Sequence, residues 1–245
     1  MGRRSVQQVF AFEPRLHNRR RRGTRRGRQA RPDRLGFVAH LPRPAHDRRH
    51  PVHVSMRRVA AAPSLRSERL YKAIVGQVAE AVRRGIRIID YSVQNDHLHL
   101  IVEADSRQRL ARGMQLLFSR IAMAVNAVAQ RSGRLFRDRH HRRALTTPTE
   151  VRRAMVYVLF NTRKHDATRI ETMIQELSWL DERSSVVWFD GWAEGARPPP
   201  SLVAAVRARA GPCPLTKPRT WLAAVGWKRG GGPLRFDETP RLPKW

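Results

Sequence analysis

The sequence predicts an α+β fold of the ferredoxin-like kind, in which an antiparallel sheet carries helices on one face. Short runs rich in Val and Ile alternate with segments whose apolar residues recur every three or four positions, in the order strand, helix, strand, strand, helix, strand, helix. The length of 245 residues suits one solid domain with appended segments. We therefore expect a disordered Arg-rich arm at residues 1–49, one folded domain at 50–170 and an irregular extension at 171–245.

The first half of that domain has the clearest patterns. Residues 51–58 alternate as a half-buried strand does, and apolar residues at helical spacing between Ser67 and Gly85 predict a helix that ends at the glycine. Residues 86–93 and 97–104 are β-rich runs separated by Gln-Asn-Asp, which predicts a hairpin. A long amphipathic helix is expected over 107–131.

The second half is less regular. A short strand is expected around Leu135 and Phe136. Thr147 is followed by a proline at the first helical position and by an acid three residues after the cap, which is a helix start signal. We expect this helix to run to about His165, and the helices to leave the other face of the sheet open for a substrate.

The charge of the chain points to a polyanionic partner. Lys and Arg number 49 against 20 Asp and Glu, a formal net charge of +29. Nucleic acid is the obvious polyanion, since binding it releases counterions from the phosphates. Charge alone does not separate DNA from RNA.

The sequence shows no sign of membrane insertion, secretion or disulfide bonding. No apolar run approaches the roughly 20 residues that a spanning helix needs, so we expect no membrane partner. The basic N-terminus lacks the apolar core of a secretory signal, so we expect a cytoplasmic protein. Cys213 is the only cysteine, which excludes internal disulfides.

An H-x-H pair lies in the second strand of the predicted hairpin. Because side chains alternate faces along a strand, His97 and His99 share one face while Leu98 and Leu100 share the other. Two neutral imidazoles so placed can bind one divalent cation, given a third ligand from elsewhere. An isolated pair of this kind is more often an ordinary surface feature, so its context decides.

The last predicted helix supplies that context. Tyr157 and Asn161 stand four residues apart and therefore lie one above the other on one helix face. Tyr157 offers a nucleophile and Asn161 an oxygen ligand. A helical tyrosine alone is usually a packing residue, and it is the conjunction with H-x-H in a very basic chain that favours a catalytic role.

These motifs resemble those of a known family, the single-tyrosine HUH transposases of bacterial insertion sequences, in particular the REP-associated tyrosine transposase (RAYT) branch. The resemblance rests on YSVQNDHLHLIVEA (91–104), on GRLFRDRHHRRALTTPTEVRRAMVYVLFNTRKH (133–165) and on the helix between them. It spans roughly residues 50–165. One departure is Asn-Thr at 161–162, where many members of the branch read Asn-Pro.

The resemblance implies an HUH nuclease fold and a reaction. His97 and His99 would be the metal-binding histidines, Asn161 would complete the metal site, and Tyr157 would attack DNA to give a 5′-phosphotyrosine and a free 3′-hydroxyl. The implied cofactor is Mg²⁺ or Mn²⁺, and the implied partner is single-stranded or hairpin DNA, with a homodimer left open. The expected phosphate contacts are Arg139, Arg142, Arg143, Arg152 and Arg153.

Two alternatives remain open at this stage. The first is a domesticated DNA-binding protein of the same descent that acts at repeated hairpins without transposing DNA. The second is a metal-dependent hydrolase, but His140, His141 and His165 lack the spacing that such enzymes use for their further ligands.

Overall fold

The computed structural model of the chain describes residues 45–164 and 179–240. Its centre is a four-stranded antiparallel sheet in the order β2-β3-β1-β4, within those residues. The strands are β1 (Val52–Arg57), β2 (Arg87–Val93), β3 (His97–Glu103) and β4 (His141–Ala144). This strand order, with a helix after β1 and after β3, is the predicted ferredoxin-like α+β arrangement.

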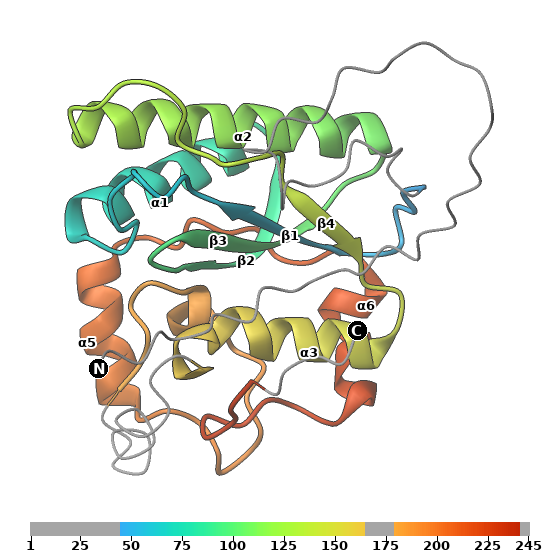
Figure 1. Cartoon of the computed structure of the whole chain (residues 1–245). Coiled ribbons are helices and arrows are strands. Elements are labelled where there is room, and N and C mark those ends of the chain that lie inside the picture. The colour runs from blue at the N-terminus through green and yellow to red at the C-terminus, as the bar shows by residue number, and fades with distance from the viewer. Residues whose placement is uncertain (1–44, 165–178, 241–245) are drawn as a thin grey trace, which may run out of the picture. The chain divides into compact units, whose positions relative to one another are not determined.

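Helices α1 (Glu68–Arg83) and α2 (Arg107–Val128) pack on one face of the sheet, as Figure 1 shows. Their apolar stripes meet the inward side chains of β1, β2 and β3 in one core. Leu117 and Ile121 of α2 are completely buried in it. The alternation of β3 holds, because Leu98, Leu100 and Val102 all belong to this core.

The opposite face is covered, and the expectation of an open face is wrong. Helix α3 (Pro148–Leu159) lies across it and packs on Ile89 and Ile101 of the sheet (Figure 1). The apolar positions of α3 recur almost all round its axis, so burial on one side only would leave a large apolar surface in water.

The start of α3 follows its sequence signal. The Thr147 hydroxyl accepts a hydrogen bond from the Glu150 backbone N–H at 3.2 Å, and the Glu150 carboxylate accepts one from the Thr146 N–H at 2.8 Å. The helix ends earlier than predicted: Phe160 is its cap, and a 3-10 turn, η2 (Asn161–Lys164), follows. His165 lies outside the described residues.

The fourth strand lies later than predicted. Leu135 and Phe136 are buried in the α1–α2 core, and only an isolated bridge joins Phe136 to Arg58. The strand itself is His141–Ala144, at the edge of the sheet against β1. An edge strand with one neighbour needs no apolar alternation, which is why its basic sequence gave no signal.

The C-terminal segment packs against the side of α3 that faces away from the sheet. It contains η3 (Ser185–Trp188), α5 (Pro200–Ala210), α6 (Trp221–Ala224) and η4 (Gly226–Gly230). Val206, Leu222 and Trp227 share a second core with α3, so this segment is part of the folded unit. In the described part of the chain, no helix is both long and apolar enough to cross a bilayer.

At the other end of the described region, ordered contacts begin slightly before the predicted domain start. The His46 ring hydrogen bonds to the Ala104 carbonyl with Nε2 and O 2.7 Å apart. Residues 1–44 of the predicted arm lie outside the described residues.

Candidate active site

The polar side chains of the sheet collect on the face that α3 covers. Val52, Val54 and Met56 of β1 point into the α1–α2 core, so His53 points to the other face. In the antiparallel register, His53 lies opposite Ile101, and Ser55 lies opposite His99. Two neighbouring strands thereby bring three imidazoles, those of His53, His97 and His99, to one place.

The three rings are in direct contact. The ring centroids of His97 and His99 are 4.6 Å apart with the planes nearly perpendicular, and His53 stacks on His99 with centroids 5.2 Å apart. His53 Nε2 lies 3.1 Å from His99 Nδ1, a hydrogen-bond distance. Burial, aided by the charges of Arg143 and His97, lowers the pKa of His53 to about 4, so this ring is neutral at pH 7.

Tyr157 of α3 sits over this cluster. Its ring packs edge-on against His99 and His53, with centroids 5.0 Å and 5.9 Å away. Only 6% of the tyrosine is exposed. Burial raises the pKa of the Tyr157 phenol to about 12, and a hydrogen-bonding interaction with Asn161 offsets this only in part.

Asn161 begins the 3-10 turn that follows α3 and is completely buried. Apart from the interaction with Tyr157, the two polar atoms of its side chain have no hydrogen-bond partner among the described residues. A buried amide with so little satisfaction is costly, and a ligand that used its oxygen would remove part of that cost.

The next residue, Thr162, is held by a partly buried polar network. Its hydroxyl bonds to Asp181 and lies 3.1 Å from Arg66 Nη1, while Arg66 also forms a two-pronged ion pair with Asp181. Gln94, at the end of β2, lies 3.4 Å from the same hydroxyl. The network ties the chain just after Asn161 to the sheet and to the C-terminal segment, at the position where the family pattern has proline.

The predicted ligands are of donor types that a divalent cation accepts. His97 Nδ1 is 2.6 Å from the Asp96 carboxylate and His99 Nδ1 is bonded to His53, so the two Nε2 atoms are the ones that could face a cation. Imidazoles held by a second partner at Nδ1 are the usual arrangement of metal-binding histidines. The predicted set adds the Asn161 amide oxygen. Among the residues that the structure describes, no group of three or more His, Cys, Asp and Glu is arranged to hold an ion.

The five arginines expected to contact phosphate lie in different settings. Arg143 pairs with His53 across β4 and β1 and makes an ion pair with Glu150, so it borders the histidine cluster. Arg142 faces the opposite side of the sheet, where burial and the charge of Arg107 lower its pKa. Arg139 is partly buried in the loop before β4.

The two arginines of α3 differ from each other. Arg153 is exposed. Arg152 is engaged within the fold, because its guanidinium binds the Glu238 carboxylate at 2.5 Å and the Gly232 carbonyl at 2.8 Å. Arg152 therefore helps to hold the C-terminal segment on α3, a role that no local sequence pattern predicts.

Sequence reasoning missed His53 and the partners of Thr162. The alternation of β1 already placed His53 off the apolar face, but only the pairing of β1 with β3 brings it to His99. Of the other histidines considered for a metal site, His140 stacks on Phe118 with centroids 5.6 Å apart, and His141 is exposed on β4. In the register of β4 and β1, His141 lies opposite Ser55, as Arg143 lies opposite His53.

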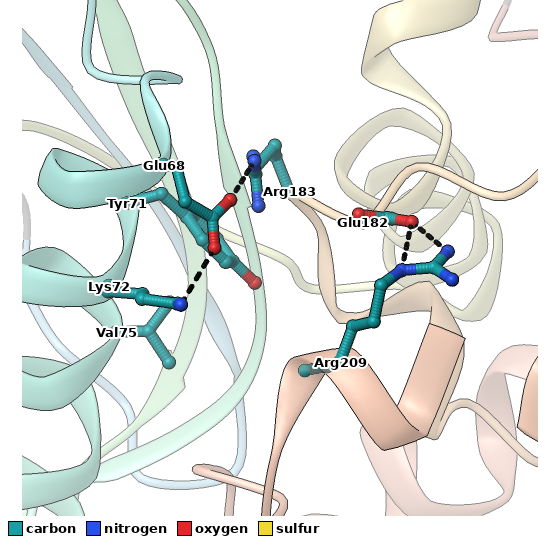
Figure 2. Close-up of a pocket in the computed structure, with 8 residues that line it drawn as sticks. Glu68, Tyr71, Lys72, Val75, Glu182, Arg183 and Arg209 are labelled. Atoms are coloured by element: carbon teal, nitrogen blue, oxygen red, sulfur yellow. Dashed lines mark hydrogen bonds and ion pairs between the residues drawn. The ribbon is translucent and has the colours of Figure 1, made fainter. Parts of the chain in front are cut away.

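A pocket elsewhere in the molecule has a different character (Figure 2). It is lined by Tyr71 and Lys72 of α1, by Arg183 and by the end of α5. Its charged groups pair with one another: Glu68 binds Lys72 and Arg183, and Glu182 binds Arg209. Paired charges offer a ligand little, so the histidine cluster is the better candidate site.

A solved structure of a REP-associated tyrosine transposase bound to a REP hairpin matches the chain with a TM-score of 0.43 and 14% sequence identity, over 54% of this chain and 77% of that chain. The structural neighbour is a member of the family that the sequence resembles. No protein-family model matches the chain, and neither does any curated protein.

Proposed function

We propose that this protein is a metal-dependent tyrosine transposase, which binds single-stranded or hairpin DNA, cuts it with Tyr157 and rejoins it. The observation that carries the proposal is the contact between Tyr157 of α3 and the histidine pair of β3, with the tyrosine and His99 ring centroids 5.0 Å apart. This contact between residues far apart in the sequence supports the proposal of an HUH-type site.

The tyrosine would act as a nucleophile. Its Oη forms a bond to the phosphorus as the bond from phosphorus to the 3′-oxygen breaks, so the phenol loses a proton and the departing 3′-oxygen takes one up. The product is a 5′-phosphotyrosine, which keeps the energy of the broken phosphodiester for rejoining. A phenol with a pKa of about 12 is a weak nucleophile at neutral pH, so the phosphate must be activated.

His97, His99 and Asn161 would hold the divalent cation, for which Mg²⁺ or Mn²⁺ is the choice that the family resemblance implies. When bound, the cation would polarise the phosphate oxygen and stabilise developing negative charge. Asp96 and His53 each lie within hydrogen-bond distance of one of the two imidazoles, which supports this assignment.

The basic surface would hold the DNA backbone. The chain carries a net charge of +29, and Arg143 borders the histidine cluster in the register of β4 and β1. Counterion release makes such binding fall steeply with salt. Arg153 and Arg139 remain further proposed phosphate contacts.

A second candidate function is favoured by the burial of the nucleophile. Tyr157 is only 6% exposed, so its hydroxyl can reach a phosphate only after side chains around it move. A domesticated protein that binds hairpin DNA without cutting it needs no such movement. Salt-dependent hairpin binding with no cleavage in Mg²⁺ or Mn²⁺ would favour this second function.

The test is a covalent-adduct assay with labelled single-stranded DNA that carries a hairpin. We expect a denaturation-resistant adduct with the wild type and none with Tyr157→Phe, which keeps the ring and removes the hydroxyl. Tyr91→Phe is the matched control, because Tyr91 is buried on the other face of the sheet with its hydroxyl 2.8 Å from that of Tyr71. An adduct that survives in Tyr157→Phe would refute the assignment.

A further inference from the structure

We propose that His53 is a positioning residue that holds His99 with its proton on Nδ1 and so presents His99 Nε2 to a divalent cation. The inference rests on the proposed function, because it concerns the metal site of that function. It assigns a role to a residue outside the H-x-H motif, contributed by a different strand.

The contact between the two rings is specific. His53 Nε2 and His99 Nδ1 are 3.1 Å apart, and the rings stack with an angle of 23° between their planes. Two neutral imidazoles joined through these atoms share one proton between them. If His53 donates it, His99 must carry its own proton on Nε2, where it would block a cation. If His99 donates from Nδ1, its Nε2 presents a lone pair.

The surroundings of His53 hold its ring beside His99. Its strand, β1, is hydrogen-bonded on both sides, to β3 and β4, which leaves the residue little freedom to move. Arg143 lies opposite it on β4, so His53 is flanked on both neighbouring strands. A neutral imidazole at this place can accept from His99 as a carboxylate accepts from other metal-binding histidines.

The arrangement mirrors that of His97. There the Asp96 carboxylate lies 2.6 Å from Nδ1, in the turn just before β3. Each proposed ligand thus has its own partner at Nδ1: a carboxylate from the adjacent residue for His97, and an imidazole from the neighbouring strand for His99. Partners of this kind change metal affinity by about 10- to 100-fold when they are removed.

The substitutions follow from the geometry. Gln at position 53 can place an amide oxygen close to the place of the imidazole Nε2 and accept from His99, whereas Leu has a similar length and no acceptor. Ser55 is the matched control, since it lies on the same strand and face, directly opposite His99, but does not bond to Nδ1. We therefore compare His53→Leu, His53→Gln and Ser55→Ala.

The first measurement is a Mn²⁺ titration of the full chain, followed by electron paramagnetic resonance. We expect His53→Leu to bind about 10- to 100-fold more weakly than the wild type. His53→Gln and Ser55→Ala should bind nearly as the wild type does. Equal affinities of His53→Leu and wild type, with both proteins folded by circular dichroism, would overturn the proposal.

The second measurement uses no metal. In ¹⁵N-histidine NMR spectra, we expect the Nδ1–H tautomer for His99 in the wild type and in His53→Gln, and a shift towards Nε2–H in His53→Leu. A His99 that carries its proton on Nε2 in the wild type would refute the positioning role. If the wild type binds no Mn²⁺, the metal site of the proposed function fails, and the tautomer still decides separately whether His53 orients His99.

Discussion

The two faces of the sheet are built from the same strands but differ in character. On the α1 and α2 side, Val54, Leu100 and Met114 pack in a core of aliphatic and aromatic side chains. On the α3 side, the alternate residues of the same strands are His53, His99 and Glu103, in contact with polar groups. A single-residue alternation therefore separates the positions that stabilise the fold from those that can carry chemistry.

The largest expected effect is on DNA cleavage, and it comes from removing His97 and His99 on the α3 side of the sheet. Changing both His97 and His99 to alanine should reduce hairpin cleavage to background, and chelation of Mg²⁺ or Mn²⁺ should do the same to the wild type. DNA binding should persist, since the arginines remain. Cleavage assays in metal and in chelator, with binding measured in parallel, test this. Equal cleavage rates for the variant and the wild type would show that the ligands lie elsewhere.

On the apolar face, Leu117→Ala should lower the free energy of unfolding by about 2 to 5 kcal/mol, because Leu117 is fully buried and its loss leaves a cavity. Urea unfolding measures the change. At a temperature where the variant is still folded, it should form the Tyr157 adduct as the wild type does. Leu116→Ala is the control, since Leu116 on the same helix is 42% exposed and should cost much less.

The polar face should also make stability depend on pH. Burial raises the pKa of Asp90 from 3.8 to about 7, against a hydrogen bond from Ser185 that lowers it. Between these values the folded protein holds more protons than the unfolded chain, so the contribution of Asp90 to stability falls as pH rises through this window. The full effect is up to about 4 kcal/mol.

The comparison that isolates this effect is wild type against Asp90→Asn, which keeps an oxygen for Ser185. His53 titrates in the opposite sense over part of the same range, so only the difference between the two proteins is informative. We expect the stability of Asp90→Asn relative to wild type to increase from pH 4 to pH 7. A constant difference would mean that Asp90 ionises normally.

The smallest effect is expected from the network around Thr162, which ties the end of α3 to the sheet and to the C-terminal segment. Thr162→Val removes the hydroxyl that bonds to Asp181 and should cost about 1 kcal/mol of stability. Because Asn161 precedes it, adduct formation should slow while hairpin affinity stays the same. Thr149→Val, in the first turn of α3, is the control. If both variants form the adduct equally fast, the network does not position Asn161.

The sequence alone determined the elements whose signals are local. The alternation of residues 97–103 fixed which side of β3 faces the core, and the Thr147 cap fixed where α3 begins, because each depends only on neighbouring residues. Tyr157 lies in α3, but Asn161 lies in the 3-10 turn after it, so the two do not share one α-helix as predicted. The end of α3 was placed too late, since the turn at Phe160 depends on contacts with the C-terminal segment.

Only the tertiary structure decided which residues from distant segments meet. No local pattern shows that β1 lies beside β3, so His53 could not be assigned to His99 from the sequence. Arg152 looks like any surface cation until the chain returns with Glu238 to bind it. The face expected to be open is covered by α3. This helix is apolar on nearly every side, so it must be buried on more than one of its sides. Periodicity determines which way a side chain points, and only the packing of separate segments determines what it finds there.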